Sequence, residues 1–266
     1  MSEPVSPEFD SRSVDELVNA ALGDLDEDKA WEAVAALHFR GTAEVLQRAR
    51  TLCESDCCQE QRLGADILGQ LGVPNRSFPA ECTSILIRML DNERDADVLQ
   101  AIFVAFWHLD DDPRVYRFAA AYAEHHDPDV RHAVVLALTG YEDPIAVNCL
   151  IRLMTDSDSD VRDWATFGIG TQLNLDTPEI RAALLARLDD ADDDTRGEAM
   201  IGMARRKDQR VISAIERDLA TSATEKAIDA AALLGSPSLL PSLLALRESL
   251  DVSPSCLNDA IKACEA

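Results

Sequence analysis

A short polar turn followed by a helix-forming segment recurs seven times along this chain of 266 residues. Each segment has a cation near its start, replaced once by leucine, and small or apolar residues follow it. A unit of about 30–45 residues with two helices cannot bury its apolar side alone and must stack on its neighbours. The sequence therefore predicts an all-α, right-handed α-solenoid of about eight antiparallel helix pairs. The aligned positions are Lys29, Arg62, Leu99, Arg131, Arg162, Arg196 and Lys226.

The composition supports one helical array. Apolar residues make up 47% of the chain, with only 11 glycines, few aromatic residues and no strand-like alternation. We expect a flexible leader over residues 1–13 and a single solenoid domain over 14–266. The approximate units are 14–40, 41–73, 78–110, 113–141, 144–174, 177–207, 209–235 and 237–265.

Several turns carry signals for the start of a helix. A capping residue precedes proline in each of four turns, where the missing N–H of proline is harmless. The predicted starts of first helices are Asp112-Pro113, Asp143-Pro144, Thr177-Pro178 and Ser236-Pro237. Second helices are predicted to start with Asp129, Asp160 and Asp194 as N-caps.

The proline starts, the Asp-x-Val-Arg pattern and the small residues that follow resemble HEAT repeats, most closely the short bacterial kind found in phycobilisome lyases. The resemblance covers nearly the whole chain and is strongest over 113–207. It implies a ladder of acids and arginines between neighbouring units, interrupted at Leu99. The matching positions are Asp129, Arg131, Asp160, Arg162, Asp194 and Arg196.

Helix periodicity divides each second helix into two sides. With the cation at position zero, positions −1, +3, +4, +6 and +7 are expected to face the core. Position +5 is apolar in every repeat, so it either widens the core or forms an exposed stripe on the concave surface. The second interpretation predicts a partner-binding surface of Ile67, Val104, Trp107, Leu136, Asp163, Trp164, Phe167 and Ile201.

Acidic residues gather in the turns between the two helices of a pair. Equivalent turns of a solenoid stack along one edge, so these acids are expected to form an acidic ridge. They either cap helices and keep the array in solution, or attract a cationic partner. The predicted ridge contains Asp156, Asp158, Asp160, Asp189, Asp190, Asp192, Asp193 and Asp194.

Charge narrows the class of partner. The chain has 49 acidic and 25 basic residues, a formal net charge of −24. Such a charge repels a phosphate backbone and attracts basic proteins. We therefore expect a basic protein or peptide as partner, and neither nucleic acid nor membrane. With no signal-peptide pattern and no 18-residue apolar segment, a cytoplasmic location is also expected, as a monomer or weak homodimer.

The sequence contains only weak patterns for catalysis, cofactors and metals. The Asp156-Asp158-Asp160 run departs from a calcium loop, and Cys53, Cys57, Cys58 and Cys82 lack the spacing of a zinc site. Gly168-Ile169-Gly170 falls inside a predicted helix, where small residues permit close packing. We expect no catalytic residue, metal or cofactor.

These observations predict a non-catalytic interaction scaffold whose acidic, partly apolar concave surface holds a basic partner. Acidic helical-repeat proteins that resemble this chain include bacterial inhibitors of toxins, which implies an immunity or antitoxin role. The alternative implied by the resemblance to phycobilisome lyases is a subunit of a phycobilin lyase, which would bind a linear tetrapyrrole.

Overall fold

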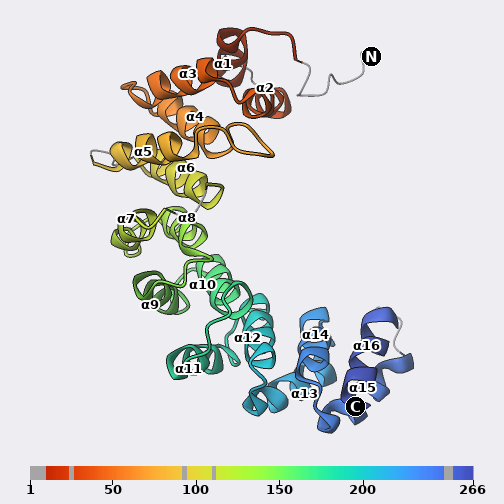
Figure 1. Cartoon of the computed structure of the whole chain (residues 1–266). Coiled ribbons are helices and arrows are strands. Elements are labelled where there is room, and N and C mark those ends of the chain that lie inside the picture. Colours follow the sequence, from red (N-terminus) through yellow and green to blue (C-terminus); the bar gives the residue numbers. More distant parts are fainter. Residues whose placement is uncertain (1–9, 24–26, 92–94, 110–111, 249–253, 266) are drawn as a thin grey trace. The chain divides into compact units, whose positions relative to one another are not determined.

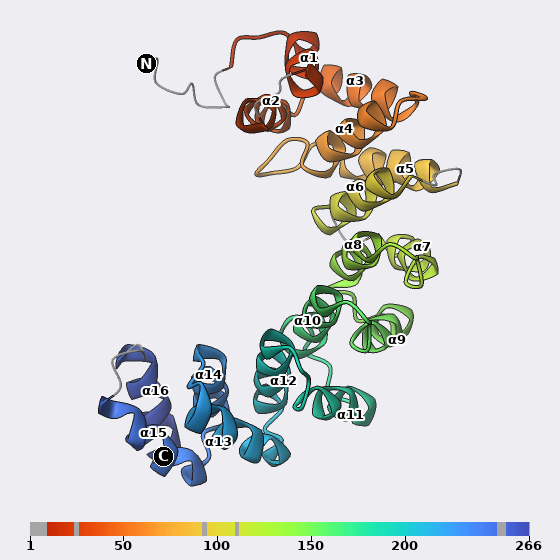
Figure 2. The same cartoon turned by 180° about the vertical axis from the view of Figure 1, so that it is seen from behind.

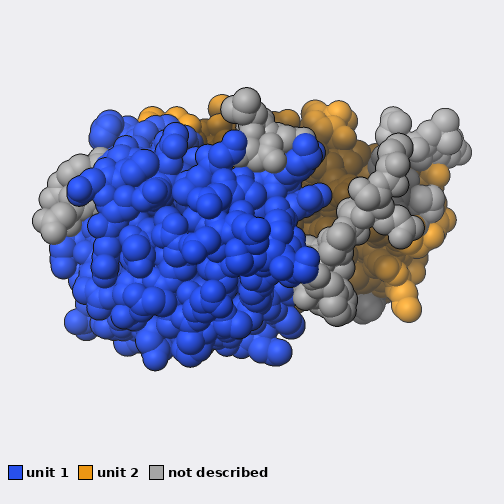
Figure 3. Space-filling view, turned by 90° about the horizontal axis from the view of Figure 1, so that it is seen from above, with its two compact units in different colours: residues 1–138 blue, residues 139–266 orange. Residues whose placement is uncertain are grey.

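The computed structural model describes residues 10–23, 27–91, 95–109, 112–248 and 254–265. In these residues the chain forms sixteen α-helices, with short 3-10 and π-helical turns and no strand (Figures 1 and 2). The predicted all-α fold of stacked helix pairs is confirmed. The chain divides into two compact units, residues 1–138 and 139–266, coloured separately in Figure 3.

The first unit contains four helix pairs, α1 (Val14–Gly23) to α8 (Pro128–Leu138). The others are α2 (Glu27–Arg40), α3 (Ala43–Cys53), α4 (Cys58–Gly69), α5 (Pro79–Leu90), α6 (Ala96–Trp107) and α7 (Val115–Ala121). Residues 1–9 of the predicted leader lie outside the described residues. Asp10 and Arg12, which follow them, form an ion pair of 2.6 Å, and Arg40 of α2 donates a hydrogen bond to the Asp10 carbonyl.

The second unit also contains four pairs. Its α-helices are α9 (Pro144–Leu153), α10 (Ser159–Phe167), α11 (Pro178–Arg187), α12 (Asp193–Arg205), α13 (Ile212–Thr221), α14 (Glu225–Leu234), α15 (Leu240–Ala245) and α16 (Pro254–Glu265). A π-helical turn, η2 (Gly168–Gln172), extends α10. The 3-10 turns are η3 (Gln209–Val211), η4 (Pro237–Leu239) and η5 (Leu246–Glu248).

The second helices of the pairs pack directly on one another within each unit. In the first unit α4 packs on α6 and α6 on α8, and in the second unit α12 packs on α10 and on α14. The first helices touch one another only loosely. The exposed side of the second helices is called the inner face of each unit below.

The predicted core positions are confirmed in the helices that contain Arg131, Arg162 and Arg196. All five core positions of each helix are buried, for example Val161, Ala165 and Ile169 in α10 and its extension. The register is wrong in α14, where Glu225 and Leu233 at positions −1 and +7 are exposed. It is also wrong in α2, where Asp28 and Glu32 at positions −1 and +3 are exposed. Lys226 pairs with Asp194 and Glu198 of α12, whereas the arginines donate to carbonyls of their own turns.

Aspartates start the second helices, but two residues earlier than expected. Asp158 accepts hydrogen bonds from the N–H groups of Asp160 and Val161, and Asp192 accepts one from Thr195 at 2.8 Å. Asp127 likewise accepts from the N–H of Asp129. Asp129, Asp160 and Asp194 therefore lie in the first turn instead of capping it. The predicted caps Asp143 and Thr177 of the first helices are confirmed. The other two predicted starts are wrong in detail, because α7 begins at Val115 and Ser236 makes no side-chain cap hydrogen bond.

Candidate interaction surface

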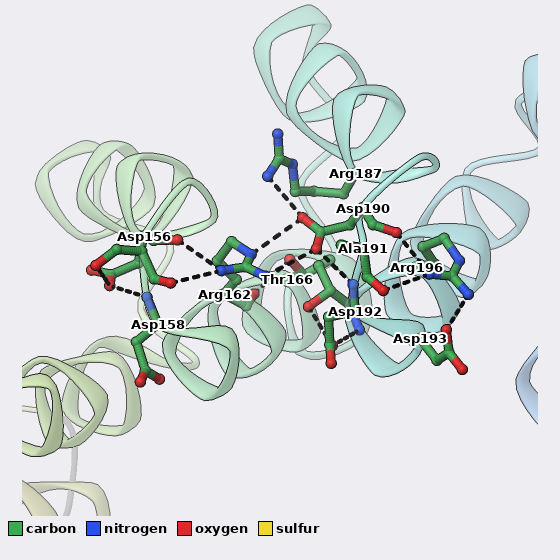
Figure 4. Close-up of polar contacts among 12 residues, drawn as sticks. Asp156, Asp158, Arg162, Thr166, Arg187, Asp190, Ala191, Asp192, Asp193 and Arg196 are labelled. Atoms are coloured by element: carbon green, nitrogen blue, oxygen red, sulfur yellow. Dashed lines mark hydrogen bonds and ion pairs between the residues drawn. The ribbon is translucent and has the colours of Figure 1, made fainter.

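Arg162 joins two consecutive repeats of the second unit (Figure 4). Its Nη1 donates to the Asp156 and Ser157 carbonyls of its own turn, at 2.9 and 3.2 Å. Its Nε and Nη2 donate to both carboxylate oxygens of Asp190 in the next repeat, at 3.2 and 3.1 Å. One guanidinium thus closes one turn and holds the next, a geometry that lysine cannot reproduce.

The ladder exists, and the predicted Asp194 takes part in it by pairing with Lys226 of the next repeat, but the predicted Asp160 is not the partner of Arg162. Arg131 and Arg196 repeat the contact with their own turns, through the carbonyls of residues 125–126 and 190–191. The carboxylate that pairs with Arg162 is Asp190, in the turn before the helix. Asp160 and Asp194 lie beyond the cap, because the helix begins two residues earlier than its sequence suggests.

Replacing Asp190 by asparagine should lower the free energy of unfolding by about 2–3 kcal/mol near pH 7. Asp190 is 6% exposed and also pairs with Arg187 at 3.0 Å. Burial raises its pKa, but hydrogen bonds from the Asp192 N–H and Arg162 and nearby arginine charges hold it below the usual value. This contribution is therefore present above the pKa of an unfolded aspartate and is lost as pH falls below about 4.

Asp189→Asn is the matched control for Asp190→Asn, because the Asp189 carboxylate is 81% exposed and pairs with an exposed Arg217. We expect Asp189→Asn to lower the free energy of unfolding by less than about 0.5 kcal/mol. Urea unfolding at pH 7 and at about pH 2, where the carboxylate is protonated in both states, measures both variants. Equal losses at pH 7, or an Asp190→Asn loss that is as large at about pH 2 as at pH 7, would contradict the assignment.

Most acids of the predicted ridge have partners inside the protein. Asp156, Asp158 and Asp192 accept hydrogen bonds from backbone N–H groups. Asp189, Asp190, Asp193 and Asp194 pair with Arg217, Arg162, Arg196 and Lys226, respectively. Asp160 is exposed in the first turn of α10. The helix-capping interpretation thus accounts for much of the ridge.

The predicted apolar stripe is interrupted in the first unit. Ile67 is fully buried and Leu136 is 7% exposed, so both belong to the core, because tight packing of second helices widens their buried sector. Val104 is half-buried, and Trp107 is 44% exposed. In the first unit only Trp107 among these predicted residues is well exposed.

The predicted surface residues of the second unit lie on its inner face. Asp163, Trp164, Phe167 and Ile201 are all half-buried. The rings of Trp164 and Phe167 meet edge to face, with centroids 5.6 Å apart. The two rings and Ile201 give this part of the inner face an apolar strip on α10 and α12.

Beside this strip, three carboxylates surround one ammonium group. Lys226 Nζ lies 2.9 Å from Glu198, 3.0 Å from Asp194 and 4.0 Å from Asp163. The side chain of Lys226 lies against Gly197, where an added Cβ would come within 2.3 Å of it. These four charged residues are called the Lys226 cluster; they come from α10, α12 and α14 and carry two excess negative charges.

The Lys226 cluster leaves one carboxylate poorly compensated. Asp163 Oδ1 is buried and has no hydrogen-bond partner. Burial raises the pKa of Asp163 to about 6, against the effect of Lys226 and with the help of Glu198 and Asp194. An additional cation placed at this carboxylate would be stabilised by the low local dielectric.

Sequence reasoning missed Glu198 and the position of Lys226. Glu198 occupies the same position after Arg196 that Trp164 occupies after Arg162, which marks it as an inner-face residue. Gly197 was the other signal, since glycine inside a helix usually marks a close approach. Among the described residues, no group of three or more potential ligands is arranged to hold a metal ion. No helix in these ranges is long and apolar enough to cross a membrane.

Comparisons with known proteins agree with the helix-pair architecture. Residues 83–170 match the family of HEAT repeats. Protein YibA of Escherichia coli K12 is 29% identical over 228 residues, which cover 84% of this chain and 81% of YibA. The X-ray structure of E. coli YibA superposes with a TM-score of 0.78 at 25% identity, covering 98% of this chain and 94% of that one. A crystal structure of an engineered protein matches with a TM-score of 0.58 at 17% identity, covering 95% and 77% of the two chains. The stacked helix pairs and these matches show that the chain is a helical-repeat solenoid similar to HEAT-repeat proteins, with the HEAT match itself over residues 83–170.

Proposed function

We propose that this protein is a non-catalytic interaction scaffold, and that the inner face of its second unit binds a basic segment of another protein. The observation that carries the proposal is the under-compensated Asp163 beside the exposed edges of Trp164 and Phe167. Carboxylates next to aromatic faces suit lysine and arginine side chains, which combine an apolar stem with a charge. The net charge of −24 would speed the approach of such a partner.

The finer form of the proposal is an inhibitor of the immunity or antitoxin type, which covers a basic surface of its target. It rests on the resemblance and on the acidic charge. In the described part of the chain, no feature favours the phycobilin lyase alternative, which stays a prediction from the resemblance alone. The partner of the scaffold is thus proposed from chemistry, as a protein segment rich in lysine or arginine.

A fluorescent 12-residue peptide of alternating arginine and serine tests the inner face. We expect Asp163→Asn to weaken its binding to the full chain about five- to tenfold at low salt, because one desolvated charge contact is lost. Anisotropy titrations at two salt concentrations measure the effect, and the affinity should fall as salt rises.

Asp160→Asn is the matched control, because it removes one charge from an exposed site on the same helix. It should change the affinity less than twofold. Equal weakening by both variants would show that peptide binding depends on net charge alone, and the proposed binding site on the inner face would then be wrong.

A further inference from the structure

A groove opens in the first unit between α1, α2 and α4. It encloses ≈ 370 Å³ and is lined, among the described residues, by Leu22, Trp31, Val34, Arg62, Leu63 and Asp66, together with small and polar neighbours. This volume is at the lower end of the range of about 300–1,000 Å³ found for ligand sites. It suits one long side chain better than a larger ligand.

The walls of the groove are apolar. Trp31 is 56% exposed, which is unusual for tryptophan, while Val34 and Leu63 are buried and present only an edge. Trp31 and Val34 come from one turn of α2, and Leu63 comes from α4. An aliphatic chain laid along these residues would cover the exposed indole face.

Asp66 supplies the groove with a carboxylate that lacks adequate compensation. In the described part of the chain its one ionic partner is Arg62, at 4.0 Å, and no donor forms a hydrogen bond to its carboxylate. Burial raises the pKa of Asp66 to about 6, and Arg62 only partly opposes this.

Other charged or titratable groups near Asp66 do not compensate the negative charge of its carboxylate. His38 of α2 places Nε2 2.9 Å from the backbone carbonyl of Asp66, not from its carboxylate. Burial lowers the pKa of His38, so its ring is neutral at pH 7. Arg62 is 54% exposed and can turn toward solvent when another cation approaches. The groove therefore combines an apolar channel with a carboxylate that gains from a donor.

We propose that this groove binds a single lysine or arginine side chain from a partner protein. The aliphatic stem packs along Trp31, Val34 and Leu63, and the cationic head meets Asp66. Only these two residue types pair a stem of three or four methylenes with a positive charge. The proposal adds a side-chain pocket in the first unit, and it does not depend on the Lys226 cluster.

The chain's three tryptophans permit a direct test, because each gives one indole N–H signal in a ¹H–¹⁵N spectrum of the full chain. Trp31→Phe identifies the Trp31 signal. The probe is a five-residue peptide, acetylated and amidated, with one central arginine between glycine and serine. Its twin carries citrulline, which has the same shape without the charge. We expect the arginine peptide to shift the Trp31 signal in a saturable manner, and the citrulline peptide to bind at least fivefold more weakly.

Asp66→Asn should weaken the arginine peptide at least fivefold, whereas Glu81→Gln, which removes an exposed acid of α5, should leave it unchanged. A thermal midpoint of Asp66→Asn at or above that of the wild type shows that the loss is not unfolding. Equal binding of the two peptides, or unchanged binding by Asp66→Asn, overturns the groove. A shift of Trp164 alone would support the inner face of the second unit and also overturn the groove.

Discussion

Replacing Arg206 by methionine should lower the free energy of unfolding of the second unit by about 3–5 kcal/mol. The guanidinium of Arg206 donates six hydrogen bonds to five backbone carbonyls, those of Ile169, Gly170, Leu173, Leu175 and Gly202. Four of these carbonyls belong to η2 and the segment after it, and one belongs to α12. Methionine keeps the apolar stem but leaves these acceptors without their donor.

Arg205→Met is the control for Arg206→Met, because the neighbouring arginine is exposed. It should change the free energy of unfolding by less than about 0.5 kcal/mol. Urea unfolding followed by Trp164 fluorescence in a Trp31→Phe, Trp107→Phe background reports on the second unit alone. If Arg206→Met unfolds at the same urea concentration as its parent, water replaces the guanidinium and the assigned role is wrong.

Replacing Gly202 by alanine should destabilise the second unit by about 2–3 kcal/mol. A Cβ at this position would lie 2.7 Å from the Cα of Gly170 and 2.9 Å from a methyl group of Leu184. Because the Cα of Gly170 belongs to the backbone and cannot rotate away, α12 must separate from η2, the extension of α10. The better helix propensity of alanine, about 1 kcal/mol, recovers only part of the loss.

Gly23→Ala is the matched control for Gly202→Ala. Gly23 ends α1, and no atom of the described residues outside its own helix lies within 4 Å of its added Cβ, so we expect no loss and a gain of up to about 1 kcal/mol. The same urea titration, with circular dichroism added for the first unit, compares the two variants. Gly202→Ala as stable as Gly23→Ala would show that the α10–α12 contact tolerates a methyl group.

The repeating part of the fold could be predicted because its causes are local. A period near 33 residues, proline after a capping residue and apolar positions on one side of each helix all act within one helix pair. The buried positions around Arg131, Arg162 and Arg196 follow from this pattern. The close packing expected at Gly168-Ile169-Gly170 is also observed, at Gly170.

The predicted helix caps and ladder partners were wrong where two nearby aspartates could each cap the same helix. Consecutive aspartates at alternate positions, such as Asp156, Asp158 and Asp160, can each cap a helix, and the pattern does not say which one does. The acid chosen for the cap also determines the acid left for the ladder. Because the second helices begin two residues earlier than predicted, Asp190, which was assigned to the acidic ridge, is the residue that pairs with Arg162.

Functional features depended on contacts between repeats, which a period cannot reveal. In the sequence, Asp66 looks like any exposed acid four residues after an arginine. In the structure, packing of α1 and α2 against α4 buries it. Arg206 lies in the run Arg205-Arg206-Lys207, which reads as solvated charge. Lys226 occupies the repeat position of a ladder arginine, but its side chain lies against Gly197 of the preceding repeat.

Within the second unit, each second helix packs chiefly on the second helices before and after it. Such nearest-neighbour cohesion makes a helix pair an exchangeable module, because its removal or duplication recreates the same kind of junction. Homologues could therefore lengthen or shorten by whole modules during evolution without a redesigned interior. Recognition of a longer or shorter target would then change in steps of one module.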